Sequence, residues 1–263
     1  MRKLQRKALK IYIFLFVMGA FGLFFRWMQD LAVFDKETGL ATPGSALSYI
    51  VAALLAVTAI AYAVIVRGLK KYKAPMELEP ALKGRTVFFP LCYIAFGFLM
   101  VAGAAWMFIA SMHSEYPVLF RILALLAVFS GVAVPVLLNG VKGRLDRGTK
   151  CLCSVVPVVQ FCFWLIVSYK VNAANPTVWA YAIEILAISA ALLGFYFLCG
   201  YAFGRARPLS AIYFCGLGGY MCFVALADSP NMGRQLMFLA TAVLLFLAAA
   251  VLVENLEETE GKK

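Results

Sequence analysis

Charge and histidine are scarce in this chain, and their scarcity excludes most catalytic metal sites. Only 14% of its 263 residues are charged, and its single histidine is His113. One histidine cannot supply a multi-histidine zinc site or a bis-histidine haem site. The sequence also has no HExxH run, no GxSxG elbow and no phosphate-binding loop. We therefore expect no metal or other cofactor, and we favour a protein without catalytic activity.

Long polar stretches are missing as well, which excludes a separate soluble domain. Hydrophobic residues make up 64% of the chain, and its mean hydropathy is +0.89. Apolar runs long enough to cross a bilayer recur along its whole length. They lie at about 11–33, 46–66, 87–110, 118–139, 152–171, 178–203, 209–227 and 235–254. Helices satisfy their backbone polar groups inside lipid, so we predict an all-α polytopic bundle of eight spans that forms one domain, 1–263.

The basic residues are unevenly distributed, and this predicts the orientation of the bundle. The net charge is +11, and 19 of the 24 Lys and Arg fall on one side of the predicted membrane. They lie in residues 1–10, 67–85, 140–150, 205–207 and 262–263. The positive-inside rule then places both termini in the cytoplasm. We expect these residues to contact anionic lipid headgroups on that side, and we expect no nucleic-acid partner.

Tryptophan marks the opposite side of the predicted bilayer. Trp27, Trp106, Trp164 and Trp179 all fall in the outer halves of their spans. Tryptophan is enriched where the hydrocarbon meets the headgroups. The sequence therefore predicts an outer aromatic belt that contains all four.

The first span carries charged residues near its outer end. Gly19, Gly22, Arg26 and Asp30 share one helical face, and phenylalanine occupies the opposite face. If the span begins at Ile11, Arg26 lies about 22 Å along an axis that rises ~1.5 Å per residue. That depth is beneath the outer edge of a hydrocarbon layer about 30 Å thick. We expect the glycine face to pack inward and the phenylalanine face to meet lipid.

Ionisable residues of other spans map to the same depth and form a predicted polar layer. Its members are Arg26, Asp30, Arg121, Glu184 and Asp228; Gln160 is the amide deepest in a span. An unpaired charge there would cost several kcal/mol, so each needs a partner or water. We predict that Arg26 or Arg121 pairs with Glu184. The layer is either a binding site for a charged or zwitterionic solute or a structural lock between helices, and the sequence leaves both open.

The longest loop on the cytoplasmic side, residues 67–85, is basic and is interrupted by Pro75 and Pro80. Two interpretations fit it. It is a candidate docking site for a cytoplasmic protein, or it is a solvated linker above anionic lipid.

Two runs resemble known sequences. FRWMQDLAVFDKETGLATPG (Phe25–Gly44) and YAIEILAISAALLGFYFLCGYAFGRARP (Tyr181–Pro208) are similar to a set of uncharacterised eight-span membrane proteins of Gram-positive bacteria. The similarity extends over most of the chain. The resemblance implies a multi-pass protein of the bacterial plasma membrane. It implies no activity and no site residues, because that family has no established activity.

Two functions remain open from the sequence. The first is a small-solute transporter, or a membrane-embedded substrate-binding subunit, whose site is the polar layer under the outer face. The second is a non-transporting scaffold or regulatory subunit in which the buried charges are structural and the 67–85 loop docks a partner.

Overall fold

The computed structural model describes residues 3–34, 45–84, 88–139, 145–173, 175, 177–228 and 231–258. Its long helices are α1 (Lys3–Ala32), α2 (Ala46–Arg67), α4 (Phe88–Ala110), α5 (Pro117–Asn139), α6 (Arg147–Asn172), α7 (Val178–Ala202), α8 (Pro208–Val224) and α9 (Met232–Glu254). The short elements are α3 (Leu78–Ala81), the 3-10 turns η1 (Ser111–His113) and η2 (Ala225–Ala227), and the strands β1 (Tyr72–Lys73) and β2 (Glu257–Glu258).

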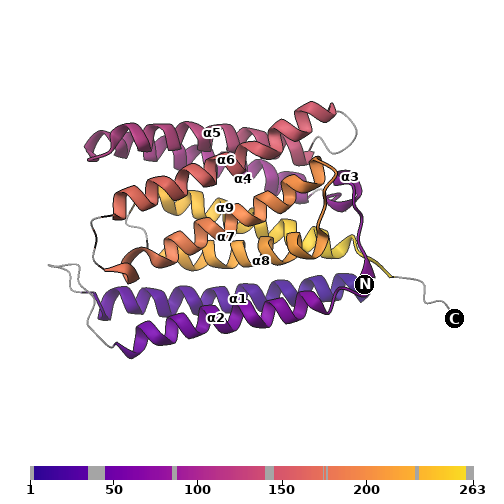
Figure 1. The fold of residues 1–263 in the computed structure, drawn as a ribbon, viewed down its shortest axis with the longest axis horizontal. Helices are drawn as coiled ribbons and strands as arrows, with labels where there is room; N and C mark the ends of the chain where they lie inside the picture. Colours follow the sequence, from indigo (N-terminus) through magenta and orange to yellow (C-terminus); the bar gives the residue numbers. More distant parts are fainter. Residues whose placement is uncertain are drawn as a thin grey trace.

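The eight long helices confirm the predicted all-α bundle of eight spans. Each is long and apolar enough to cross a bilayer. They run roughly parallel to one axis, and the two ends of the chain emerge at the same end of the bundle (Figure 1). We call this the terminal end and the opposite one the distal end. A chain that crosses a bilayer an even number of times has both of its ends on the same side, whichever way the protein faces.

Helices α4 to α9 form a ring. Each packs against the next, and α9 returns to pack against α4. Almost every residue of α9 between Met237 and Val253 is buried, because α9 has neighbours on nearly all sides. Helix α1 packs outside the ring on α8 and α9, and α2 packs on α1 and α8. The fold therefore consists of a six-helix ring and a peripheral helix pair.

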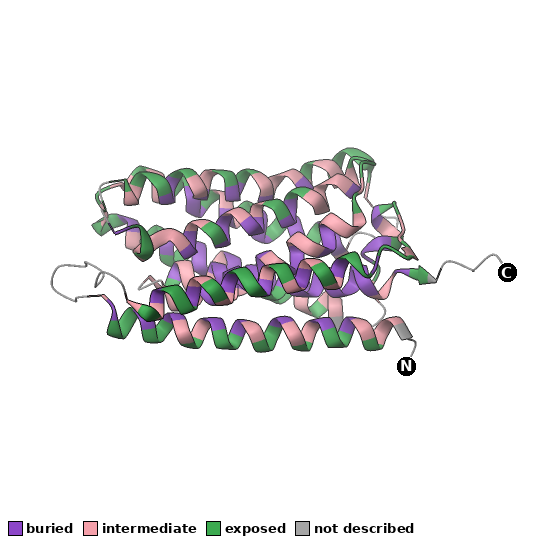
Figure 2. Cartoon of the chain, turned by 60° about the horizontal axis from the view of Figure 1, so that its bottom comes forward, coloured by how far each residue is buried: buried purple, intermediate pink, exposed green. Residues whose placement is uncertain are grey.

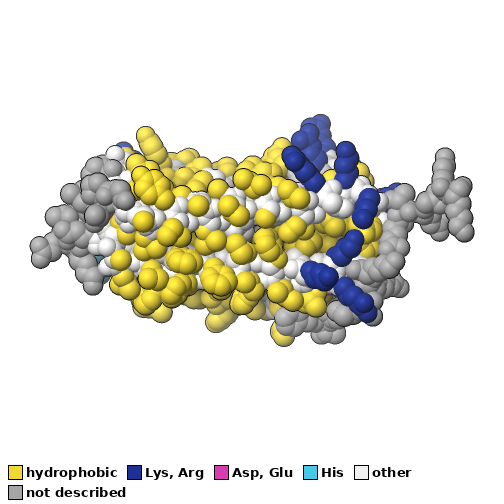
Figure 3. Space-filling model, turned by 90° about the horizontal axis from the view of Figure 1, so that it is seen from below, with side chains coloured by type: hydrophobic (Ala, Val, Ile, Leu, Met, Phe, Trp, Pro, Cys, Tyr) yellow, Lys and Arg dark blue, Asp and Glu magenta, His cyan; other side chains and the backbone are white. Residues whose placement is uncertain are grey.

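The outside of the bundle is apolar. Exposed large side chains such as Phe98, Ile60 and Tyr169 lie on outward faces of the helices, and exposed residues follow the outer faces in Figure 2. A patch of this size would aggregate in water, whereas lipid accepts it. Figure 3 shows lysine and arginine gathered at the terminal end, with an apolar surface along the rest of that face. The molecule is therefore an integral membrane protein with one basic end.

Glycine allows close helix contacts at several points in the bundle. As predicted, Gly19 and Gly22 of α1 face inward, where a Cβ would meet Phe223 and Val224 of α8. Helices α4 and α5 approach more closely still. A Cβ on Gly97 would collide with the backbone oxygen of Gly131, and the reverse contact is also tight. Lipid supplies no hydrophobic driving force between helices, so the close van der Waals packing that small residues allow contributes to their association.

The 67–85 loop is anchored to the terminal end at several points, although many of its described residues are exposed. Leu78, Ala81 and Leu82 are buried. The Asn255 side chain donates to the carbonyl oxygens of Ala81 at 2.9 Å and Lys83 at 3.2 Å. Strand β1 also pairs antiparallel with β2. Arg85 lies outside the described residues.

Candidate functional site

Arg26 is buried at the distal end, and all three of its guanidinium nitrogens donate hydrogen bonds to neighbouring residues. Its guanidinium pairs with Asp228, which follows η2. It also donates to Gln29 Oε1 at 2.8 Å, to the Trp179 carbonyl at 3.1 Å and to the Ala180 carbonyl at 3.4 Å. The Arg26 and Asp228 side chains are each only 2% exposed. Arg26 therefore connects α1 to η2 and to the first turn of α7.

Gln29 extends this network to the peripheral helix. It lies one turn after Arg26 on α1 and is fully buried. Its side-chain nitrogen donates to Ser48 Oγ of α2 at 2.9 Å. The amide thus accepts from Arg26 and donates to Ser48, which orients both contacts. Helix α2 is held at this point by a buried polar contact as well as by packing.

A second ion pair lies in the same distal layer but is built differently. Arg234 Nη1 of α9 is 3.2 Å from both carboxylate oxygens of Glu184 on α7. Ser168 of α6 also donates to Glu184 Oε1, at 3.3 Å. The predicted pairing of Glu184 with Arg26 or Arg121 is therefore wrong. The sequence interpretation missed Arg234 because it began the last span at residue 235, whereas α9 begins at Met232 and has Arg234 in its first turn.

The second pair is more open than the first, and each pair keeps one buried polar atom without a partner within the described part of the chain. The Arg234 side chain is 20% exposed and the Glu184 side chain 9%. Among the described residues, Arg234 Nε and Asp228 Oδ2 are buried without a hydrogen-bond partner. Arg234 Nε is a donor in the first turn of α9, and Asp228 Oδ2 is an acceptor at the end of η2. Buried polar atoms are normally paired, so each retains capacity for a further bond.

The surroundings of Asp228 disfavour the charged form of its carboxyl. It follows the span Pro208–Ala227. Burial raises the pKa of its carboxyl to about 6, Arg26 opposes this rise, and Glu184 and Asp30 reinforce it. Arg26 therefore has to compensate both for the lost hydration of Asp228 and for neighbouring negative charge.

The remaining predicted site residues lie elsewhere. Asp30 and Arg121 are exposed. The Arg121 guanidinium lies 5.8 Å from the ring centroid of Phe108, at the edge of the bundle. Gln160 is fully buried, deeper in the ring, where it donates to Met100 Sδ at 3.8 Å. Of the six predicted residues, the structure brings together Arg26, Asp228 and Glu184.

A hollow of about 320 Å³ opens at the distal end, between η1 and the adjoining ends of α4, α5, α6 and α9. Its polar lining residues are Ser111, His113, Ser114, Glu115, Tyr116 and Asn231. Val171 of α6 also lines it. We call it the distal hollow. It contains the single histidine of the chain, which the sequence interpretation did not assign to any site.

The Glu184–Arg234 pair is connected to residues about one helical turn from the lining of the distal hollow. Val171 and Asn231 line the hollow. Ser168, which bonds Glu184, is three residues deeper on α6 than Val171, and Arg234 is three residues deeper on α9 than Asn231. Residues three apart on a helix are neighbours on one face. Ser168 and Arg234 are thus each about one helical turn from a residue that lines the hollow.

Trp164 corrects the predicted aromatic belt. Trp27, Trp106 and Trp179 are exposed at the distal end, as predicted, but Trp164 is only 1% exposed. It lies inside the ring, with its ring centroid 4.6 Å from that of Phe238 and 5.5 Å from that of Phe161. Phe161 in turn lies 5.1 Å from Phe195. We call these four residues the aromatic cluster.

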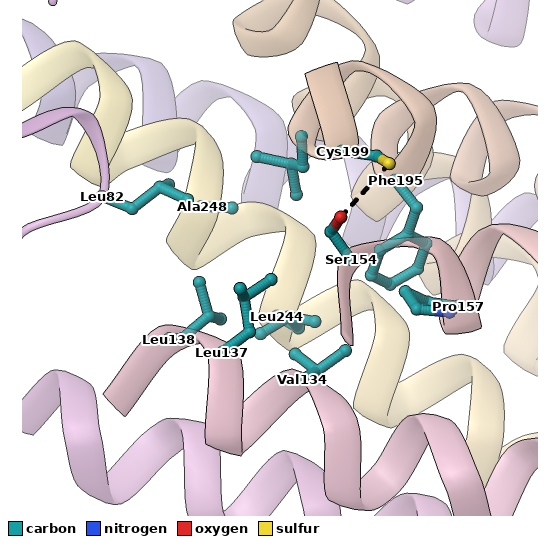
Figure 4. Close-up of a pocket in the computed structure, with 11 residues that line it drawn as sticks. Leu82, Val134, Leu137, Leu138, Ser154, Pro157, Phe195, Cys199, Leu244 and Ala248 are labelled. Atoms are coloured by element: carbon teal, nitrogen blue, oxygen red, sulfur yellow. Dashed lines mark hydrogen bonds between the residues drawn. The ribbon is translucent and has the colours of Figure 1, made fainter. Parts of the chain in front are cut away.

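A second, smaller cavity lies inside the ring toward the terminal end. It has a volume of about 20 Å³ and is almost entirely apolar. Pro157, Phe195, Leu244 and Val134 project around it in Figure 4, together with Ser154 and Cys199. Ser154 Oγ and Cys199 Sγ lie 3.3 Å apart. We call it the inner cavity.

Searches of known protein families, curated proteins and solved structures find no match to this chain. The function must therefore be argued from the two ion pairs, the distal hollow and the ring.

Proposed function

We propose that this integral membrane protein binds a small polar solute at its distal end and carries it across the bilayer, alone or as the membrane-embedded subunit of a larger transporter. The solute enters the distal hollow and is held by Glu184 and Arg234. The observation that carries this proposal is the difference between the two arginines. Arg26 is buried and all three of its guanidinium nitrogens are hydrogen-bonded, whereas Arg234 is partly exposed, has an unbonded Nε and lies near a hollow.

The dimensions of the distal hollow support a small solute. Ligand pockets are commonly about 300–1,000 Å³ in volume, so this hollow is at the lower end of the range. Its polar groups include a hydroxyl, an imidazole, a carboxylate and an amide. Such a mixture suits a solute that both donates and accepts hydrogen bonds.

The Glu184–Arg234 pair favours a solute with separated opposite charges. An ammonium group can replace Arg234 at the carboxylate, and a carboxylate can replace Glu184 at the guanidinium. The free Nε of Arg234 offers an additional donor, and guanidinium groups bind carboxylates through two parallel hydrogen bonds. When a zwitterion binds, the Glu184–Arg234 ion pair is replaced by two ion pairs between the protein and the solute, so no charge is left unpaired.

The orientation of the protein follows from its basic end. We infer that the terminal end faces the cytoplasm and the distal hollow faces the outside, since lysine and arginine gather at the terminal end (Figure 3). Anionic lipids contact the basic residues there. With the resemblance to Gram-positive membrane proteins, this favours solute binding at the outer face of a bacterial plasma membrane.

The test is ligand-induced stabilisation of the purified protein in detergent, with a panel of small zwitterions, namely amino acids and betaines. Saturation to about 100 times Kd stabilises a protein by about 2.7 kcal/mol. We expect at least one zwitterion to raise the unfolding temperature of the parent and to drive uptake into proteoliposomes. Glu184→Gln keeps the hydrogen bond to Ser168 but removes the charge, so it should abolish both responses.

Glu79→Gln is the matched control. It removes the carboxylate of the partly exposed Lys150–Glu79 pair at the terminal end, whose N–O distance is 2.7 Å. This variant should respond to the solute as the parent does. The proposal fails if no zwitterion stabilises the parent, or if Glu184→Gln responds like the parent.

The second candidate is a non-transporting scaffold or regulatory subunit. It is favoured by the many buried bonds of Arg26, which fix α1, α2, α7 and η2 relative to one another. It is also favoured by the basic terminal end, where the exposed part of 67–85 would dock a cytoplasmic protein. On this alternative, Glu184→Gln lowers stability with no solute response to lose.

A further inference from the structure

The distal hollow and the inner cavity belong to the same ring of helices. Residues of α5 and α6 line both, and α9 lines the inner cavity while its N-cap residue, Asn231, lines the hollow. On α6 a buried stripe runs from Ser168, one turn from Val171 of the hollow, past Trp164 and Gln160 to Ser154. Helix α9 begins just after Asn231 of the hollow and passes Phe238 to reach Leu244 and Ala248, which line the inner cavity. The two spaces therefore lie at opposite ends of one interior.

Along α6 and α9 the aromatic cluster lies between the residues that line these two spaces. Trp164 and Phe238 project from facing helices toward each other, with centroids 4.6 Å apart. Phe195 continues the cluster and also lines the inner cavity. Packed aromatic rings exclude water and solute without any charge or hydrogen bond that would have to be broken.

The interior around this cluster contains unsatisfied polar oxygens. Gln160 Oε1 and Ser130 Oγ are buried and have no hydrogen-bond partner among the described residues. Gln160 is about 18 Å from the distal end of α6, and Ser130 about 20 Å from that of α5, at ~1.5 Å per residue. Both are thus near the middle of the bilayer. Unpaired polar groups at that depth are costly and indicate a place where a polar partner is taken up.

Two of the helices around the inner cavity, α5 and α6, contain an internal proline. Pro157 of α6 lines the cavity, and Pro135 of α5 follows Val134, which also lines it. Proline removes a backbone hydrogen bond and allows a helix to bend. At the terminal end, Leu82 of the packed 67–84 segment also lines the cavity. Asn255 holds the carbonyl of Ala81 next to it.

We propose that the interior of the α4–α9 ring is a solute route, shut in this structure by the aromatic cluster, and that the solute which takes it is net-neutral. The proposal rests on the proposed function and extends it. Arg26, Asp228 and Glu184, whose side chains are at most 9% exposed, lie in the distal layer. Deeper in the ring, the buried polar side chains of the described residues are uncharged, Gln160, Ser130 and Ser154 among them. A zwitterion or an uncharged polar solute can pass them without leaving an unpaired charge in the bilayer.

The native Cys199 provides a test, because it lines the inner cavity behind the aromatic cluster. The six other cysteines are replaced by alanine, and the protein is reconstituted in vesicles with the distal face outward. A membrane-impermeant methanethiosulfonate is added outside, and an impermeant thiol is trapped inside as a quencher. The parent should be protected. Trp164→Ala should raise the labelling rate of Cys199 about tenfold or more, because it removes a buried ring from the cluster.

Phe98→Ala is the matched control, because Phe98 is a highly exposed, outward-facing residue of α4. It should leave Cys199 protected. Phe238→Leu is a milder second opening variant in case Trp164→Ala does not fold. Protection of Cys199 in a folded opening variant overturns the route. The labelling experiment needs no solute, so it tests the route separately from the proposed ligand. If the opening variants are labelled but no zwitterion stabilises the protein, the route stands and the proposed ligand class is rejected. If a zwitterion binds but the folded opening variants stay protected, the protein binds its solute without this route.

Discussion

Arg26→Met is expected to destabilise the protein by about 3–5 kcal/mol, the range found when one partner of a buried ion pair is removed. Methionine fills a similar volume but leaves Asp228 buried without its counter-charge. It also breaks the bonds to Gln29 and to the two α7 carbonyls. The unfolding temperature in detergent, followed by tryptophan fluorescence, measures the loss.

The pH dependence of this loss identifies its cause. The pKa of Asp228 is already raised to about 6 by burial, above its ordinary value of 3.8. Without the guanidinium it rises further, so the folded variant favours the protonated carboxyl. The carboxyl is then neutral at low pH and needs no counter-charge. The stability deficit should therefore be largest above neutral pH and shrink as the pH falls through that pKa.

Two comparisons make the prediction specific. Lys150→Met removes one partner of the partly exposed pair with Glu79, and it should cost less than about 1 kcal/mol. Arg26→Met combined with Asp228→Asn should recover part of the loss, because no charge is left buried. An Arg26→Met protein as stable as Lys150→Met would contradict a structural lock at the distal end.

Gly97→Ala is expected to destabilise the contact between α4 and α5 by about 1–3 kcal/mol, the usual cost of overpacking. A Cβ at this position would overlap the Gly131 carbonyl oxygen and would lie 2.8 Å from Pro135 Cγ. A backbone atom cannot move aside as a flexible side chain can, so the two helices must separate. For a protein of this size each kcal/mol lowers the unfolding temperature by roughly 2–4 °C.

Gly68→Ala is the control for glycine loss itself. Gly68 is the exposed C-cap of α2 and has φ −63°, a conformation open to alanine. Its substitution should be neutral or slightly stabilising, because alanine reduces the freedom of the unfolded chain. Equal losses in the two variants would mean that helix separation at Gly97 is not the cause.

Much of the fold could be predicted because the bilayer imposes it. Each long apolar run must become a helix whatever its neighbours are, so the eight spans follow from hydropathy alone. The inward orientation of Gly19 and Gly22 was also predictable, since it depends only on the period of one helix.

The charged layer was predicted only in outline. Depth along each helix placed Arg26, Glu184 and Asp228 together, because rise per residue is fixed. Their partners were not predictable, since pairing depends on which helices are neighbours and how each is rotated. Arg234 was missed for a second reason: moving the start of a helix by three residues turns an apparent loop arginine into a helical residue that pairs with Glu184.

The sequence by itself therefore determined a membrane-spanning helical bundle with one basic end and a polar layer near the other. Only the tertiary structure decided which arginine is locked by Asp228, which is left partly open beside a hollow, and that Trp164 lies inside the ring instead of at the headgroups. The physical reason is that transfer into lipid acts on each segment separately, whereas ion pairing and side-chain packing depend on distances between segments far apart in the chain.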